Sequence, residues 1–270
     1  MRLTIQHRTV YRYSEPATHS IQYLRLIPRR DNRQRVLAWH LGVPAPAYEY
    51  VDAYGNTTRV LVLDRLHEEI LIEVDGLVET PENVGDPSED DGTLSPLVFL
   101  RETPLTKVDP LLHELASGYE ALVASDMLAG LRELMYGIRR AVRYKQGTTS
   151  AQSTAASALA QGAGVCQDHS HIFIACCRAL GVPARYVSGY LYSESDPALQ
   201  AASHAWAEAW VDPLGWFSFD VANTQSAGAT HLRLAVGRDY LDACPVRGMR
   251  FGGGSEEMDV HVRVMISQQQ

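Results

Sequence analysis

The chain has 270 residues, of which 46% are hydrophobic and 21% are charged. This length allows one large domain or two modest ones, and the composition is that of an ordered globular protein. The formal net charge of −8 argues against a general nucleic-acid or anionic-membrane binder, because both surfaces would repel the chain.

The first residues, Met1 to His7, alternate in the manner of a β-strand and contain no basic leader followed by an apolar run. No apolar stretch approaches the ~20 residues that a membrane-spanning helix needs. We therefore expect a cytoplasmic protein with no membrane partner and no nucleic-acid partner.

Residues 1–80 carry the alternation of apolar and polar side chains that is typical of half-buried strands. Leu3 and Ile5 begin one such run, and residues 54–56 form a Tyr-Gly-Asn turn signal between two later runs. Several short strands separated by turns predict an antiparallel β-rich N-terminal domain.

Residues 81–108 are predicted to form a linker. The stretch from Glu79 to Thr93 is rich in acidic residues, proline and glycine and carries few apolar side chains. Such a stretch buries too little surface to offset the chain entropy lost on ordering.

Residues 109–270 are predicted to form an α+β catalytic core. Asp109 is an N-cap followed by proline, and helical periodicity then continues to about residue 142. A short helix is expected from about Thr154 to Gly162, and a longer one from Cys166. The remaining chain alternates as strands, ending with a closing run at 260–264.

Cys166 has the most unusual setting of the four cysteines. Cys176 and Cys177 fall in an apolar helical run, which suits buried thiols, and no Cys-x-x-Cys pair exists. Cys166 follows a glycine-containing turn at the start of a helix, where unpaired N–H groups and the helix dipole favour a negative sulfur. The same N–H groups could stabilise an oxyanion on a substrate. This position predicts a thiol nucleophile.

His204 and Asp220 lie on the two strands of one predicted hairpin, and their register decides whether they meet. Pairing Val211 with Trp216 would point Asp220 away from His204, because side chains alternate between faces. Pairing Trp210 with Trp216 instead places Asp220 opposite Trp206, with His204 as its diagonal neighbour. We predict this second register.

Three blocks in this order and spacing resemble the bacterial transglutaminase-like superfamily: Gly164-Val165-Cys166-Gln167-Asp168, Ser203-His204-Ala205-Trp206 and Gly215-Trp216-Phe217-Ser218-Phe219-Asp220. Residues 237–240 and 245–248 also match that subgroup, and the first half resembles the β-rich domain that precedes the core in many bacterial members. The sequence Asp-Val-Ala-Asn at 220–223 departs from the common Asp-Pro-Thr-Asn, so the loop after Asp220 is expected to differ in shape.

The resemblance implies a papain-like α+β core with the cysteine at a helix start and the histidine and aspartate on adjacent strands. It implies acyl transfer from an amide through a thioester, with Cys166 as nucleophile, His204 as general base and acid, and Asp220 fixing the histidine tautomer. No cofactor is expected.

Seven further residues are candidates for substrate-binding or supporting roles: Gln167, Asp168, His169, His171, Trp206, Tyr144 and Asp239. Each also has an ordinary structural interpretation. A carboxylate in the first helical turn, such as that of Asp168, suits the helix dipole whatever its function, and Trp206 is equally suited to a core or a cleft wall. No metal site is predicted, because no Cys/His spacing fits one.

Two functions remain open on the sequence. The first is a cysteine enzyme acting on a peptide or protein amide, with either an amine (transglutaminase-like) or water (peptidase or amidase) as acyl acceptor. The second is a catalytically silent peptide-binding or scaffold protein that keeps the fold. The intact Cys166, His204 and Asp220 set favours the first.

Overall fold

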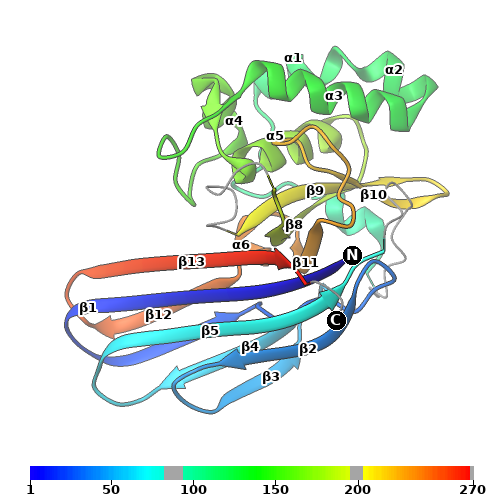
Figure 1. The fold of residues 1–270 in the computed structure, drawn as a ribbon. Coiled ribbons are helices and arrows are strands. Elements are labelled where there is room, and N and C mark those ends of the chain that lie inside the picture. Colours follow the sequence, from blue (N-terminus) through cyan, green and yellow to red (C-terminus); the bar gives the residue numbers. More distant parts are fainter. Residues whose placement is uncertain (82–93, 195–202, 268–270) are drawn as a thin grey trace.

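The computed structural model describes residues 1–81, 94–194 and 203–267, and shows two lobes (Figure 1). We call residues 1–80 with 246–267 the β lobe, and residues 94–244 the mixed lobe. The predicted α+β fold is confirmed. Of the predicted linker, residues 82–93 lie outside the described residues. The rest of it is not a linker but part of the mixed lobe, because Phe99 and Leu105 are buried there. Within the described ranges, no helix is long and apolar enough to cross a membrane.

The β lobe is one curled antiparallel sheet built around a very long first strand. Its strands are β1 (Arg2–Leu24), β2 (Arg35–Gly42), β3 (Ala47–Val51), β4 (Thr57–Leu63), β5 (His67–Glu79), β12 (Val246–Gly252) and β13 (Glu256–Ile266). Strand β1 pairs with β5 and β4 in succession, and with β13 and β12 in succession. Because its pairing shifts register between Arg12 and Ala17, the sheet bends there and curls over on itself (Figure 1).

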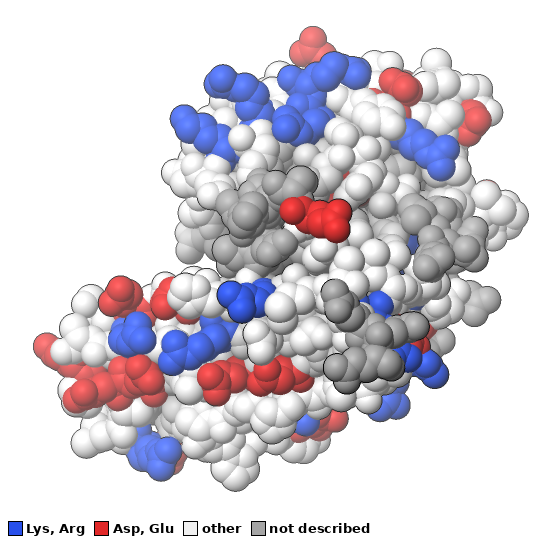
Figure 2. All heavy atoms as spheres, in the orientation of Figure 1, with Lys and Arg blue, Asp and Glu red and all other residues white. Residues whose placement is uncertain are grey.

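Alternation along the strands explains which face of this sheet is buried. On β5, Ile70, Ile72 and Val74 are buried while Glu73 and Asp75 are exposed. On the outer face, basic and acidic side chains form neighbouring rows (Figure 2), and cross-strand ion pairs join Arg8 to Glu73 and Arg12 to Glu69. The outer face is therefore solvated and mixed in charge.

The predicted closing strand exists as β13, but it does not close the catalytic core. Residues 246–266 run along β1, with Leu3 opposite Ile266 and Leu24 opposite Val246. The last segment of the chain therefore returns to the β lobe. Its apolar side chains, including Val262 and Val264, join the core of that lobe.

The mixed lobe packs helices against a four-stranded antiparallel sheet of order β10-β9-β8-β11. The strands are β8 (Ala184–Leu191), β9 (His204–Val211), β10 (Gly215–Phe219) and β11 (His231–Gly237), with two short strands, β6 (Arg143–Tyr144) and β7 (Ala163–Gly164). The helices are η1 (Pro96–Leu100), α1 (Pro110–Ser117), α2 (Glu120–Ser125), α3 (Met127–Ala141), α4 (Ala155–Gln161), α5 (Cys166–Ala179) and α6 (Tyr240–Ala243). The apolar stripe of α5 lies in the core that covers β9.

The capping signals in the sequence mark the observed helix boundaries. The Asp109 carboxylate accepts a hydrogen bond from Leu112 N, and the Thr154 hydroxyl accepts one from Ser157 N. Helix α4 ends at Gly162, whose φ of 63° lies in the left-handed region that suits glycine. This turn leads directly into the start of α5.

Side-chain amides of the β lobe bind the outer edge of β11. Gln34 donates to the Arg233 carbonyl oxygen and accepts from Arg233 N, each over 2.8 Å. Asn56 does the same with the carbonyl and N–H of Val236, again over 2.8 Å. These two side chains satisfy backbone groups that β8, on the other side of β11, does not reach.

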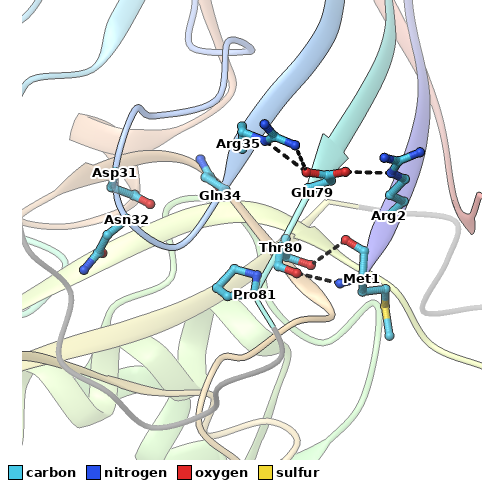
Figure 3. Close-up of a pocket in the computed structure, with 9 residues that line it drawn as sticks. All are labelled: Met1, Arg2, Asp31, Asn32, Gln34, Arg35, Glu79, Thr80 and Pro81. Carbon is cyan, nitrogen blue, oxygen red and sulfur yellow. Dashed lines mark hydrogen bonds and ion pairs between the residues drawn. The ribbon is translucent and has the colours of Figure 1, made fainter.

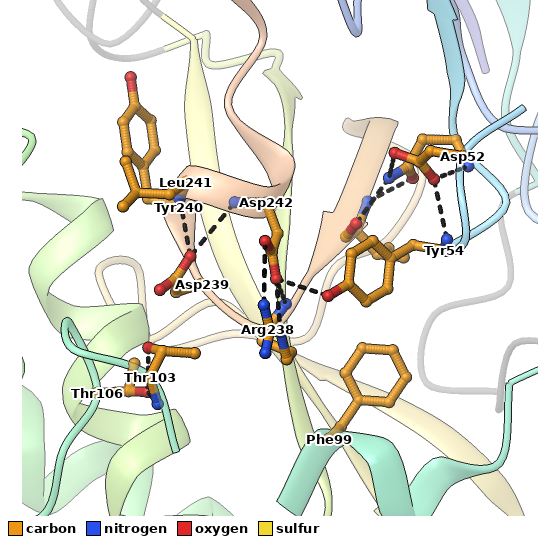
Figure 4. A network of polar contacts seen from close by, with 12 residues as sticks. Asp52, Tyr54, Phe99, Thr103, Thr106, Arg238, Asp239, Tyr240, Leu241 and Asp242 are labelled. Atoms are coloured by element: carbon orange, nitrogen blue, oxygen red, sulfur yellow. Dashed lines mark hydrogen bonds and ion pairs between the residues drawn. The ribbon is translucent and has the colours of Figure 1, made fainter. Parts of the chain in front are cut away.

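A polar network joins the lobes near α6 (Figure 4). The Tyr54 hydroxyl of the β lobe donates to Asp242 Oδ2 over 2.7 Å, and the same carboxylate pairs with Arg238 over 2.8 Å. A second network is more deeply buried, where Arg233 contacts both Glu208 and Asp31. The lobes are therefore linked by specific polar contacts as well as by apolar packing.

Candidate active site

The first turn of α5 holds Cys166 as its first residue, and the thiol is only partly buried. Asp168 Oδ2 accepts hydrogen bonds from Val165 N over 2.8 Å and from the Thr149 hydroxyl over 2.7 Å. Val165 has no polar side chain, so the helix start depends on this carboxylate and not on a reciprocal capping box. Asp168 thus fixes the turn that presents Cys166.

Two of the predicted supporting residues, His169 and Tyr144, contact the backbone of this turn directly or through each other. The ring nitrogens of His169 lie 2.9 Å from the carbonyl oxygens of Val165 and Val142. Tyr144 stacks on the His169 ring with 6.2 Å between centroids. His169 is fully buried, so its ring supports the backbone around Cys166 from inside the protein. Tyr144 is partly buried and packs on that ring.

The three other supporting candidates contact different parts of the mixed lobe. His171 is fully buried and accepts a hydrogen bond from Tyr240 N over 3.1 Å, and Asp239 is the N-cap of α6. Gln167 is partly buried and donates to the Ala151 carbonyl oxygen over 3.3 Å. These three residues hold α5 and α6 in place, and Gln167 is the one on the surface beside Cys166.

The hairpin of β9 and β10 has the predicted register. Trp210 pairs with Trp216, and the ladder continues to Phe219 opposite Ala207. The ladder ends there, and Asp220 forms an isolated bridge with Gln225. His204 Nε2 donates to Asp220 Oδ2 over 2.9 Å, which is the diagonal contact that this register allows.

The Asp220 carboxylate is completely buried and accepts several donors. Oδ2 receives hydrogen bonds from His204 Nε2 over 2.9 Å, from His231 Nε2 over 3.0 Å and from Asn223 Nδ2 over 2.7 Å. Asn223 N also lies 3.3 Å from Oδ1. A buried carboxylate with this many donors is held as an anion in one orientation.

The loop after Asp220 keeps its asparagine in contact with the site. Asp220 and Gln225 exchange backbone hydrogen bonds across the turn, and Thr224 has a φ of 54°. Arg139 of α3 donates to the Ala222 carbonyl oxygen over 3.1 Å. The segment that replaces the common Pro-Thr therefore still places Asn223 beside the carboxylate.

The charges of the site reinforce one another. Burial opposes charge on His204, but the Asp220 carboxylate, its hydrogen bond and the contact with Cys166 outweigh it and raise the pKa of His204 to about 10. Burial likewise opposes charge on Asp220, yet the two histidines hold its pKa well below the usual range. Burial, the largest influence on His231, lowers the pKa of that ring. The site is thus built to keep a cation on His204 and an anion on Asp220.

Trp206 lies behind this pair and not in an open cleft. Its ring is fully buried, stacks near His204 at 6.1 Å and meets His231 edge-on at 5.2 Å. Of the two interpretations left open by the sequence, this position corresponds to the core, because the side chain has no exposed surface.

His231 and Asn223 were not among the predicted site residues. His231 is buried on β11 and approaches from the strand on the far side of β8, so no local spacing connects it to Asp220. The available signal was an unusual strand composition, in which His231 and Arg233 interrupt an apolar run. Asn223 was visible only as a retained part of the family pattern.

His204, Asp220 and His231 also form a cluster of possible metal ligands, with ligand atoms within 4.8 Å of one another. The donor chemistry fits a metal poorly. A histidine binds a metal through a neutral nitrogen, whereas the raised pKa of His204 keeps that ring protonated at neutral pH. Hydrogen bonds from both rings to Asp220 already account for the short distances.

A hollow of about 670 Å³ lies away from these residues, between the first residues of the chain and the loop around Asp31 (Figure 3). Its charged side chains are paired with one another, since Arg2 and Arg35 both contact Glu79. None of the predicted site residues lines it. The hollow is therefore separate from the candidate active site.

Comparisons with known proteins agree with the resemblance seen in the sequence. Residues 3–79 match the family model of the bacterial transglutaminase-like N-terminal region, and residues 117–221 match that of the transglutaminase-like superfamily. An uncharacterized protein of Mycobacterium leprae is 31% identical, with 97% of this chain and 98% of that protein covered. An uncharacterized protein of Mycobacterium tuberculosis is 30% identical, with 98% and 92% covered.

Two further proteins carry functional names. A protein-glutamine gamma-glutamyltransferase of Pseudomonas aeruginosa is 33% identical over 100 residues, which are 33% of this chain and 15% of that protein. The crystal structure of a candidate cysteine protease from Cytophaga hutchinsonii has a TM-score of 0.73 and 22% identity, with 100% of this chain and 92% of that one covered. The second likeness establishes the fold.

Proposed function

The chain belongs to the transglutaminase-like superfamily, and from this membership we propose that it is a cysteine enzyme that transfers the acyl group of a peptide or protein amide through a thioester on Cys166. The observation that carries the proposal is the charged His204–Asp220 pair beside a partly exposed thiol at a helix start. A peptide-binding scaffold would have no need to bury an ion pair against a reactive thiol.

The proposed first half-reaction begins with Cys166 as a thiolate and His204 as an imidazolium. With Nε2 bonded to Asp220, the other ring nitrogen, Nδ1, is the one available to Cys166. The sulfur attacks the amide carbonyl carbon, and backbone N–H groups of the first turn of α5 stabilise the resulting oxyanion. His204 then protonates the leaving amine, the C–N bond breaks, and a thioester remains on Cys166.

The second half-reaction reverses these roles. An amine or water attacks the thioester carbonyl while His204 accepts its proton, the C–S bond breaks, and the thiolate–imidazolium pair is restored. Asp220 keeps its negative charge throughout and stabilises the histidine cation. An amine acceptor gives a transglutaminase-type product, and water gives hydrolysis.

The likeness to the Pseudomonas glutamyltransferase supports glutamine as the acyl donor, whereas the likeness to the Cytophaga candidate cysteine protease supports hydrolysis of the main chain. A single experiment separates them. The protein is incubated with a glutamine-containing peptide library and a fluorescent primary amine, and the products are analysed by mass spectrometry. Amine-linked glutamine indicates transfer, glutamate in its place indicates deamidation, and shortened peptides indicate hydrolysis of the main chain.

Intact-protein mass spectrometry of the same reaction tests the thioester itself. We expect an acyl adduct on Cys166 in the wild type and none in Cys166→Ala. Cys244→Ala, which removes a buried thiol, is the matched control and keeps the adduct. A wild-type protein that forms no adduct and no product with any peptide, while binding peptides, would instead support the scaffold function.

A further inference from the structure

His231 contacts the same carboxylate oxygen as His204, but the second nitrogen of its ring has different partners. Both Nε2 atoms lie close to Asp220 Oδ2, at 3.0 Å and 2.9 Å. His204 turns its remaining nitrogen toward Cys166, whereas His231 turns its own into the loop before β11. Two histidines on one carboxylate could compete for the same charge, so the contacts of the second ring decide its role.

The loop before β11 fixes the tautomer of His231. Gly228 N lies 3.3 Å from His231 Nδ1, and a backbone N–H can only donate. The Thr230 hydroxyl lies 3.1 Å from the same nitrogen. Nδ1 is therefore an acceptor without a proton, and the single proton of the neutral ring is on Nε2, where it is donated to Asp220.

The same contact disfavours a second proton on the ring. Protonation of Nδ1 would bring its hydrogen against the Gly228 N–H and remove an acceptor from that partly buried backbone group. The other charged groups that face His231 are Asp220, His204 and Arg33 of the β lobe, and both cations also oppose a positive charge on it. His231 thus remains neutral while His204 carries the charge.

We propose that His231 is a positioning residue for the reaction assigned above, which holds the Asp220 carboxylate toward His204 as a neutral donor and leaves the imidazolium charge to the histidine that faces Cys166. This inference rests on the proposed function. The His231 ring has a fixed position, because Trp206 packs edge-on against it at 5.2 Å. The strand that carries the ring, β11, is in turn hydrogen-bonded at its outer edge by Gln34. The β lobe therefore contributes to the orientation of the reacting pair.

The test uses the full chain and the pH dependence of Cys166 alkylation by iodoacetate, an anionic probe that reacts best with a thiolate–imidazolium pair. His231→Phe keeps a ring against Trp206 but removes both nitrogens. His231→Gln places an amide N–H near the position of Nε2 and restores the donor. His7→Gln is the matched control, because His7 is another buried histidine, bonded to Tyr190 and Thr9 away from the site.

In the wild type we expect a bell-shaped profile whose upper limb follows the loss of the His204 proton. His231→Phe is expected to slow alkylation at pH 8 about tenfold and to move the upper limb down by about one pH unit, because His204 loses its oriented partner. His231→Gln should recover most of both effects, and His7→Gln should change neither. A merely structural role for the ring would not move the limb.

A folded His231→Phe variant with the wild-type profile overturns the inference, as does equal loss in the Phe and Gln variants. If the Phe variant does not fold, nitrogen-15 NMR of the wild type decides. A constant Nε2–H tautomer from pH 5 to pH 9 supports the proposal, and titration of the His231 ring in that range overturns it. A wild type without a bell-shaped profile contradicts the proposed function itself, which is a separate outcome.

Discussion

The two ends of α5 place the same side chain in opposite chemical settings. Cys166 begins the helix, is partly exposed and contacts His204. Cys176 and Cys177 lie near its end with no exposed surface, and burial raises the pKa of Cys176 to about 12 and that of Cys177 well above its usual range. The difference shows that the position on the helix, and not the residue type, determines which thiol can react.

The sharpest test of this comparison is selective labelling. In the folded protein at pH 7.5, iodoacetamide should modify Cys166 on the order of 10³ times faster than Cys176, because the buried thiol has almost no thiolate and no access. Peptide mapping after short exposures measures both rates. Denaturant serves as the control, since all four cysteines should then react at similar rates. Comparable labelling of Cys176 in the folded state would remove the contrast.

The next largest effect is expected on the rate of acylation when the negative charge of Asp220, which stabilises the His204 cation beside Cys166, is removed. In Asp220→Asn, the pKa of His204 should fall from about 10 toward its ordinary 6.5, so the imidazolium is lost at neutral pH and acylation at pH 8 slows about 100-fold or more. The pH profile of acylation is the measurement. Asp242→Asn, which affects a carboxylate paired with Arg238, is the control and should leave the upper limb in place.

The same variant should change how stability depends on pH. The raised pKa of His204 gives stabilisation that is complete below 6.5 and is lost as pH rises through about 10. The lowered pKa of Asp220 gives stabilisation that is present above 3.8 and is lost only as pH falls through the lower folded value. Thermal unfolding of the wild type should therefore show the full stabilisation from the His204–Asp220 pair between pH 3.8 and pH 6.5. Asp220→Asn should lose this stabilisation in the same range.

The smallest effect concerns the turn that presents Cys166. Asp168→Ala removes the acceptor for Val165 N and Thr149, and should cost about 1 kcal/mol and slow Cys166 labelling by a few fold. Asp126→Ala removes the N-cap of α3, where the carboxylate likewise accepts a backbone N–H, from Ala129. It should cost a similar amount in urea unfolding without slowing labelling. Equal labelling rates in the two variants would mean that Asp168 only caps the helix.

The sequence predicted the parts of the site that depend on local pattern. The plain turn before Trp216 predicts the other register, and the register that brings His204 and Asp220 together was chosen because their side chains must lie on one face of the hairpin. The helix start at Cys166 followed from the glycine-containing turn. In both cases the decisive residues lie within about 20 positions of one another, so local reasoning about turns and about which residues share a face was sufficient.

Contacts between distant segments were not predictable in the same way. His231 meets Asp220 although β11 and β10 are the two edge strands of the sheet, because Asp220 lies beyond the end of β10, in the turn that it shares with Gln225. The strand at 256–266 was recognised as a strand, but its partner, β1, lies at the other end of the chain. A period-2 pattern indicates that a strand has one buried face and does not say which sheet buries it.

The side-chain amides of Gln34 and Asn56 cover the outer edge of β11, which the mixed lobe alone would leave exposed. A strand at the border of a sheet offers a row of free N–H and C=O groups to any other extended chain, and native proteins block such borders. Here the blocking groups are two short side chains, so the border is closed without a strand that another molecule could displace or exchange. Separation from the β lobe would uncover β11 as a template for intermolecular strand pairing, with only β8 between it and the strand that carries His204, so self-association would be expected.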